Sequence, residues 1–167
     1  VLQVLMPTLD RTLGLGASAG RAVHYAAVPT LRVQQPSELR QIRPHCDGIY
    51  GLQEGALNFW LPLTEVEPAC TLHLESSPGR RDFHPLLPHV GELVRFDGRR
   101  CLHYTTPNTT GITRVSLDFR CVVGEHFDPA NRLARRGYYS EARLMSDGRY
   151  SKIRSGTVSE LHGLPHT

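Results

Sequence analysis

The sequence predicts a single all-β domain of the jelly-roll type, and two observations support this prediction. Residues 23–123 contain about eight or nine short runs of extended character at a spacing of roughly 8–12 residues, with no convincing helical pattern between them. Turn-forming residues separate these runs, as in sandwiches and barrels. A double-sheet jelly roll closes its edges and leaves one open mouth.

The individual strands follow from runs of aliphatic, aromatic and β-branched residues. We expect them at residues 23–28, 31–34, 56–64, 70–75, 83–87, 92–96, 102–105 and 113–123. Turn signals lie at residues 76–79, 97–98 and 107–108. Residues 37–43 lead into a strand edge at His45, where Pro44 favours an extended residue before it. Residues 48–55 are expected to form a loop.

Two segments flank the core of residues 23–123. Residues 1–22 form an N-terminal segment whose glycines miss the phosphate-binding and dinucleotide spacings, so we expect a flexible segment or entrance loop. Residues 124–167 form an Arg-rich C-terminal tail with few large apolar residues. We expect this tail to be solvated and partly ordered, with a short helix near residues 129–136, or to cover the barrel mouth. The chain begins at Val1, so we expect a trimmed N-terminus.

Composition narrows the class of protein. The chain has 167 residues, 40% hydrophobic and 21% charged, which is typical of one globular soluble domain. Lys152 is the only lysine among 19 basic residues, and the arginines are spread along the chain, which disfavours nucleic-acid binding. No apolar run approaches the ~18 residues of a membrane span. The four cysteines lie far apart without a Cys-x-x-Cys pair, so we expect reduced thiols in a cytoplasmic protein.

The triplet His45-Cys46-Asp47 is the first chemical signal. In an extended segment the side chains of His45 and Asp47 point to the same side while Cys46 faces away. A third ligand would come from a distant strand, and His103 is the best candidate because it lies in the extended run of residues 101–104, beyond a turn. Two histidines and one carboxylate hold iron and leave coordination sites open.

A second signal follows His103 at residues 114–116. Alternation along the strand puts the guanidinium of Arg114 and the hydroxyl of Ser116 on one face, and this pair can hold a carboxylate. Asn58 and Trp60 share one face of an earlier strand. Alternatively, Arg114 pairs with Asp118 on the barrel surface and carries no function.

The order and spacing of these features resemble the Fe(II)/2-oxoglutarate-dependent dioxygenases, which carry His-x-Asp/Glu and a distal His followed by an Arg or Lys. The resemblance covers residues 32–120. More narrowly, the runs at residues 58–64 and 113–120 look like a bacterial subgroup of streptomycin-biosynthesis and related natural-product oxygenases. Members of the family usually carry N-terminal helices that buttress the barrel, and we expect these to be missing from this sequence.

The resemblance implies a cupin-like double-stranded β-helix in which His45, Asp47 and His103 are the Fe(II) ligands. 2-Oxoglutarate would take two of the remaining positions and dioxygen the third. Oxidation of an unactivated C–H of a small-molecule substrate, most simply hydroxylation, would release succinate and CO2. Desaturation and ring closure remain open, as do the substrate's identity and the number of subunits.

The resemblance also implies roles for the residues around the metal. Arg114 would grip the far carboxylate of 2-oxoglutarate, because a planar guanidinium suits a carboxylate. Ser116 would add a hydroxyl donor, Asn58 a further contact to the cosubstrate, and Trp60 a wall of the pocket.

Two other classes of function compete with this interpretation. The first is a non-oxidative metal-binding cupin, an isomerase, lyase or ligand-binding protein, since residues 91–108 look something like the second cupin motif. However, Asp47 stands where the first cupin motif carries a second histidine, and Arg114 would have no role. The second is a catalytically idle barrel that binds another protein through its tail, against which the intact ligand set argues.

Overall fold

The computed structural model describes residues 6–7, 21–39, 41–147 and 149–153. The chain divides into two compact units, Val23–Ser140 and the combined segments Val1–Ala22 and Glu141–Thr167. Most of the expected N-terminal segment and the end of the expected tail lie outside the described residues. The larger unit contains all the predicted site residues and extends beyond the expected core limit at residue 123.

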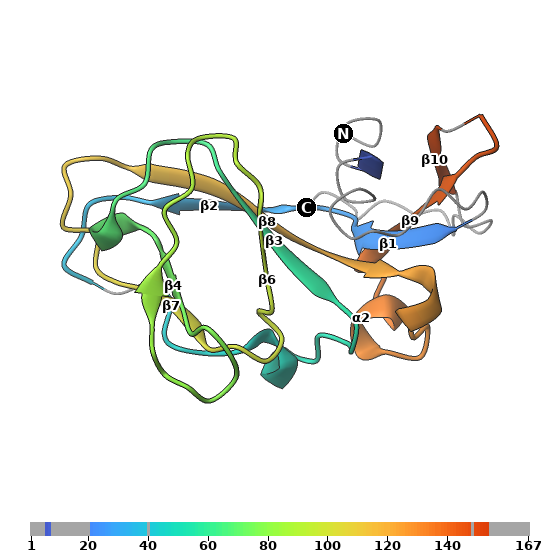
Figure 1. Ribbon diagram of the computed structural model, residues 1–167, viewed down its shortest axis with the longest axis horizontal. Coiled ribbons are helices and arrows are strands. Elements are labelled where there is room, and N and C mark those ends of the chain that lie inside the picture. Colours follow the sequence, from blue (N-terminus) through green and yellow to red (C-terminus); the bar gives the residue numbers. More distant parts are fainter. Residues whose placement is uncertain (1–5, 8–20, 40, 148, 154–167) are drawn as a thin grey trace, which may run out of the picture. The chain divides into compact units, whose positions relative to one another are not determined.

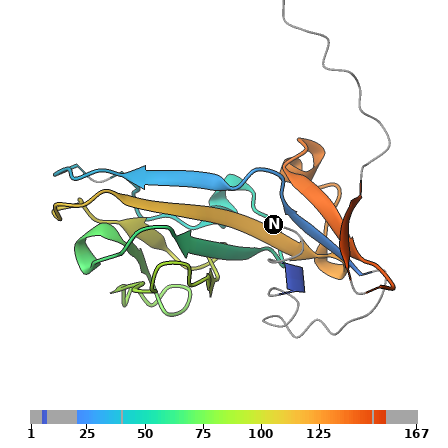
Figure 2. The same ribbon diagram turned by 90° about the horizontal axis from the view of Figure 1, so that it is seen from above.

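The larger sheet of this unit is organised around one long strand, β8 (Figure 1 and Figure 2). β3 pairs with one edge of β8 and is followed by β6, while β1 and β2 pair with successive parts of the other edge. All of these pairings are antiparallel. The strands are β1 (Ala22–Ala26), β2 (Thr30–Gln34), β3 (Leu57–Pro62), β6 (Val94–Phe96) and β8 (Arg114–Val123).

The smaller sheet has the antiparallel order β5-β4-β7. Its strands are β4 (Leu72–Leu74), β5 (His84–Pro85) and β7 (His103–Thr105). Three 3-10 turns connect strands of this unit: η1 (Asp47–Tyr50), η2 (Pro68–Cys70) and η3 (Gly124–His126). Each of these strands overlaps its predicted segment, with ends that differ by up to two residues, and the two-sheet arrangement is the predicted jelly roll. The expected loop at residues 48–55 instead begins with η1.

Apolar side chains from both sheets form the core between them. Trp60 of β3 and Phe96 of β6 pack with Leu72 and Leu74 of β4 in one buried cluster. Trp60 is 3% exposed, and truncating a buried tryptophan to alanine costs ~3–5 kcal/mol. This cluster holds the two sheets apart. Trp60, Leu72 and Phe96 of the cluster also line a small cavity between the sheets.

Two strands form where the sequence analysis expects a partly ordered tail. β9 (Tyr139–Leu144) and β10 (Tyr150–Ile153) pair antiparallel, and Ala142, Leu144 and Tyr150 are buried. The expected short helix is present as α2 (Arg132–Arg135), capped by the Asn131 side chain, which accepts a hydrogen bond from the Leu133 backbone N–H. None of the described helices has the length and apolar character to cross a membrane.

All four cysteines are free thiols, as predicted. Cys70 and Cys121 are fully buried, and burial raises the pKa of the Cys121 thiol to about 12. Cys46 is half-buried.

Candidate metal centre and adjoining cavities

The local backbone brings the three predicted ligands together. Cys46 is extended (φ −119°, ψ 145°), so its neighbours His45 and Asp47 turn their side chains to the same side. His45 lies outside the named strands but forms an isolated β-bridge to His103, with N–H···O=C distances of 3.2 and 2.9 Å. This bridge, and not proximity in sequence, places the third predicted ligand beside the first two.

The three side chains converge on one point. Asp47 Oδ1 lies 3.6 Å from His45 Nε2 and 3.7 Å from His103 Nε2, and one ligand atom from each residue lies within 4.8 Å of the others. Asp47 and His103 are 5% and 6% exposed, and His45 is half-buried. Both separations exceed hydrogen-bond length, so the three groups face one another without bonding directly.

Neighbouring groups hold these side chains in a ligating arrangement. Each imidazole Nδ1 lies near a backbone carbonyl, His45 on Arg43 O at 2.8 Å and His103 on Cys101 O at 3.1 Å. Nδ1 must then carry the proton, which leaves the Nε2 lone pairs directed at the centre. The other oxygen of the Asp47 carboxylate, Oδ2, is held by two neighbouring side chains.

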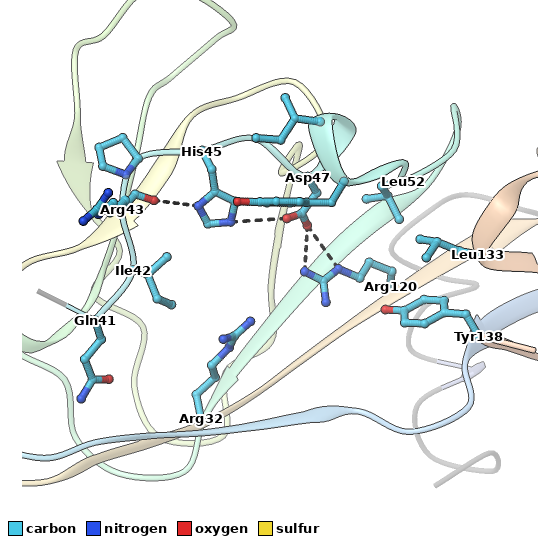
Figure 3. A pocket seen from close by; sticks show the side chains of 13 residues that line it. Arg32, Gln41, Ile42, Arg43, His45, Asp47, Leu52, Arg120, Leu133 and Tyr138 are labelled. Carbon is cyan, nitrogen blue, oxygen red and sulfur yellow. Dashed lines mark hydrogen bonds and ion pairs between the residues drawn. The ribbon is translucent and has the colours of Figure 1, made fainter. Parts of the chain in front are cut away.

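Asp47 Oδ2 accepts hydrogen bonds from two side chains. Asn58 Nδ2 donates at 2.6 Å. Arg120 donates to the same oxygen through Nη2 at 2.8 Å and Nε at 3.2 Å, and Figure 3 shows this pair. Oδ1 therefore remains for the centre. Asn58 Oδ1 is buried and has no hydrogen-bond partner among the described residues, so the predicted contact to a cosubstrate stays a prediction.

This donor set fits a first-row divalent metal. Two imidazole nitrogens and one carboxylate oxygen offer their lone pairs to a shared, largely buried point, where unshared lone pairs would repel and lie desolvated. A divalent cation satisfies all three at once. The outer hydrogen bonds of His45, His103 and Asp47 are those that orient metal ligands in proteins.

The electrostatic surroundings keep two of the three groups in their binding form. Burial opposes ionisation of Asp47, but the neighbouring His45 and the Arg120 guanidinium outweigh it and hold the pKa of Asp47 well below its usual range. Burial lowers the pKa of His103, which favours the neutral imidazole. The Asp47 carboxylate raises the pKa of His45, the most exposed of the three. An ionised carboxylate and a neutral imidazole are the forms that bind metals.

Arg114 is buried beside this centre with only neutral partners. It is 3% exposed and donates to Cys70 O at 3.1 Å, Ser116 Oγ at 2.5 Å and Gln34 Oε1 at 2.7 Å. Its guanidinium carbon lies 5.6 Å from the centre of the Trp60 ring. No carboxylate of the described residues makes an ion pair with Arg114, so the alternative pairing with Asp118 is wrong. Burial lowers its pKa, but an arginine stays charged.

Asp118 forms ion pairs with two other arginines, Arg32 and Arg120. It accepts from Arg32 Nε at 2.6 Å and from Arg120 Nη1 at 2.8 Å, so that Arg120 bridges Asp118 and Asp47. Sequence reasoning missed Arg32, Arg120 and also Gln34, the partner of Arg114. The signal was available for Arg120, because residues 114, 116, 118 and 120 alternate along one strand and share a face.

Two cavities adjoin the centre. An inner one of about 40 Å3 is lined by His45 and His103, by Asn58 and by Arg114. An outer one of about 740 Å3 is lined by His45, Asp47 and Arg120 among others (Figure 3). The arrangement thus joins a metal-ligating triad, a buried cation and a space of small-molecule size.

Comparison with known proteins gives one relative in sequence and several in structure. No known protein family matches the chain as a sequence profile. The chain is 30% identical over 111 residues to the streptomycin biosynthesis protein StrG of Streptomyces griseus, a match that covers 66% of this chain and 52% of StrG.

Among solved structures, the non-heme monooxygenase ThoJ superposes with a TM-score of 0.55 in its apo form and 0.54 in its nickel complex, both at 16% identity. Each superposition covers 71% of this chain, and covers 51% of the apo chain and 49% of the chain in the nickel complex. The non-heme alpha ketoglutarate dependent epimerase SnoN from nogalamycin biosynthesis superposes with a TM-score of 0.50 at 16% identity, over 73% of this chain and 50% of SnoN. The chain therefore spans about half the length of the relatives it matches. The structural likeness confirms the jelly-roll fold.

Proposed function

We propose that this chain forms the core of a non-haem Fe(II)/2-oxoglutarate-dependent oxygenase that oxidises an unactivated C–H of a small molecule, hydroxylation being the simplest outcome. The observation that carries the proposal is Arg114, a buried guanidinium without a carboxylate partner among the described residues, in a cavity that also reaches His45 and His103. The names of two neighbours, a non-heme monooxygenase and an alpha ketoglutarate dependent epimerase, agree with this class. StrG points in addition to natural-product biosynthesis.

The charge of Arg114 is the main argument for an anionic ligand. Burying a charge is costly unless an opposite charge or several hydrogen bonds compensate it. Three of the five guanidinium N–H groups bind neutral acceptors, which leaves two on Nη1 and Nη2 for a ligand. Two N–H groups on a planar guanidinium suit one carboxylate. A dicarboxylate with a keto acid at its other end can therefore bind both Arg114 and the metal.

The residues of such a site would have two roles, to bind the metal and to orient its ligands. His45 Nε2, His103 Nε2 and Asp47 Oδ1 would hold Fe(II), and Asn58 and Arg120 fix the Asp47 carboxylate through its other oxygen. Iron together with 2-oxoglutarate and dioxygen supplies oxidative decarboxylation to succinate and CO2 and the oxidation of a substrate C–H. The apolar cluster behind the inner cavity excludes water from that chemistry.

Arg114 is itself oriented by its neutral partners. Ser116 Oγ and Gln34 Oε1 each accept one N–H, and both residues are buried at 0% and 1% exposure. The guanidinium plane is thereby fixed before any ligand arrives, which reduces the entropy cost of binding. Ser116 thus supports Arg114, and its predicted contact with the cosubstrate stays part of the proposal.

The inner cavity must widen to accept a cosubstrate. Its volume of about 40 Å3 is far below the ~300–1,000 Å3 usual for small-molecule sites. Arg32 and Ile42 line both cavities, so displacement of these two side chains outward would join the spaces. We expect 2-oxoglutarate to bind with such a displacement, with its far carboxylate on Arg114.

The deciding experiment is an anaerobic titration of the Fe(II)-loaded protein with 2-oxoglutarate, followed by visible absorption. A keto acid chelated to Fe(II) gives a weak metal-to-ligand charge-transfer band, and we expect this band to appear and saturate. Succinate, which lacks the keto group, is the matched control and should give no band. If iron-loaded protein gives no band, the site is instead that of a non-oxidative metal-binding cupin.

A further inference from the structure

The outer cavity has the size and position of a substrate site. Its volume of about 740 Å3 lies within the ~300–1,000 Å3 usual for small-molecule sites. His45 and Asp47 form part of its wall, so a molecule bound there reaches the metal centre. The whole lining belongs to the larger compact unit.

The lining combines apolar and aromatic side chains with charged and polar ones, and the polar ones include Gln41 and His45. Ile42, Ile49 and Leu133 supply aliphatic surface, and Tyr50 and Tyr138 supply aromatic surface. The charged residues of the wall are Asp47, Arg32, Arg43 and Arg120. Tyr138 and Leu133 come from the first part of the tail, so that segment forms one side of the cavity (Figure 3).

The carboxylate of this wall, that of Asp47, already has partners for both of its oxygens. Asp47 turns Oδ1 to the two histidines and gives Oδ2 to Asn58 and Arg120. Arg120 is committed as well, because Nε and Nη2 bind Asp47 and Nη1 binds Asp118. The charges of Asp47 and Arg120 therefore compensate each other, and neither residue is the main binding group for a charged ligand.

Two arginines of the wall keep free donors. Arg32 uses only Nε, on Asp118, so both of its NH2 groups remain, and its side chain is 40% exposed. Arg43 makes no side-chain hydrogen bond or ion pair with any described residue. Figure 3 shows the two side chains on different parts of the wall, Arg32 reaching up from β2 and Arg43 beside His45. The cavity therefore has an excess of positive charge at Arg32 and Arg43.

We infer that the outer cavity binds an anionic small molecule, a carboxylate or phosphate ester, whose charged group is taken by Arg32 or by Arg43 and whose body contacts the tyrosines and aliphatic side chains. The inference deepens the proposed function, since the bound molecule would be the substrate presented to the metal. The two anions are assigned to different arginines, that of the cosubstrate to Arg114 in the inner cavity and that of the substrate to the outer cavity, although Arg32 lines both cavities. Arginine suits both carboxylate and phosphate groups.

The test compares probes that share one body and differ in charge. Benzoate, phenyl phosphate, benzyl alcohol and benzylamine are titrated into protein loaded with Fe(II) and saturated with 2-oxoglutarate under anaerobic conditions, and binding is followed by saturation-transfer NMR. Saturation with 2-oxoglutarate fills the inner anion site. We expect at least one of the two anions to bind about tenfold or more tightly than benzyl alcohol, as for charge-assisted hydrogen bonds, and benzylamine to bind most weakly. The stronger of the two anions identifies the substrate as a carboxylate or a phosphate ester.

Two variants locate the binding. Whichever of Arg43→Gln and Arg32→Gln removes the arginine that holds the charged group should lower the affinity for the preferred anion about five- to tenfold and leave the affinity for benzyl alcohol unchanged. Arg95→Gln is the matched control, because Arg95 is an exposed arginine that lines a different groove, between residues 54 and 100. The inference is overturned if benzyl alcohol binds as tightly as both anions, if neither variant weakens anion binding, or if Arg95→Gln weakens it equally.

The charge-transfer band separates this inference from the proposed function. If the band forms and anions show no preference, the substrate inference fails and the oxygenase proposal stands. If no band forms with 2-oxoglutarate and anions still bind through Arg32 or Arg43, the oxygenase proposal fails and the anion site stands. Loss of the band on addition of benzoate would place the anion at the inner site and overturn the inference.

Discussion

Replacing Arg114 by Met should separate ligand binding from stability. Methionine has similar length but no charge, so it leaves the inner cavity with only Arg32 and Arg120, both of which are paired with carboxylates. In the wild-type protein the guanidinium is buried with three neutral acceptors and no carboxylate partner among the described residues. Its positive charge is therefore a cost in the ligand-free protein and a gain only when an anion is bound.

The magnitude follows from the charge pair that 2-oxoglutarate would form. A carboxylate about 4 Å from the guanidinium gains ~4 kcal/mol at an effective dielectric of about 20. Desolvation of the ligand carboxylate offsets part of this gain, which leaves about 2–3 kcal/mol. The expected loss of 2-oxoglutarate affinity in Arg114→Met is thus about 30- to 140-fold. Arg114→Lys keeps the charge but cannot make two parallel hydrogen bonds to a carboxylate, so its affinity for 2-oxoglutarate should lie between those of the wild-type protein and Arg114→Met.

The assay combines the charge-transfer titration with thermal unfolding. Arg114→Met should retain Fe(II), change the free energy of unfolding of the ligand-free protein by less than about 2 kcal/mol, and show no stabilisation by 2-oxoglutarate. If Arg114 served only its three buried acceptors, its removal would leave each of them unsatisfied at a cost of about 1–3 kcal/mol per acceptor. An unchanged affinity for 2-oxoglutarate, or a large loss of stability alone, would refute the reasoning.

Three further predictions address the metal centre and its surroundings. His45→Ala or His103→Ala should lose the metal while keeping the β-rich circular dichroism spectrum; metal retained after dialysis in either variant would contradict the ligand assignment. Gly98→Ala should weaken metal binding about tenfold or more, because the new Cβ would lie 2.7 Å from the Asn58 amide and displace it from the carboxylate that it orients; competition with a chromophoric chelator measures the affinity, and an unchanged value would exclude this role. Cys46 should react alone with a thiol reagent in the native protein, and all four thiols after unfolding, since the other three are buried; rapid reaction of more than one thiol before unfolding would disagree with the packing.

The strands and the alignment of His45 with Asp47 could be predicted from local sequence patterns, whereas the approach of His103 to them depends on its bridge to His45. Alternation of side chains identifies each strand and also puts Arg114 and Ser116 on one face of β8. The same rule aligns His45 and Asp47 across an extended Cys46. These features depend on backbone geometry within a few residues, which the sequence by itself determines. The strands β9 and β10 were missed because the tail that contains them has few large apolar residues and little regular alternation.

The partners of the site residues depended on contacts that no local pattern contains. Arg120 reaches Asp47 across 73 positions of the chain, and Arg114 reaches Gln34 across 80. Asn58, predicted to contact a cosubstrate, lies in register opposite Arg120 and donates to the Asp47 carboxylate. The register of β2 against β8 puts Gln34 opposite Arg114, and that of β3 puts Asn58 opposite Arg120, because directly opposed residues of antiparallel strands point to the same side. Asp47 lies outside these strands, in η1, and its backbone N–H is held by Gly98 O at 2.7 Å. The sequence alone therefore determined which groups are available for metal and anion binding, and only the packing of the strands decided which of these groups are neutralised and which are left for ligands.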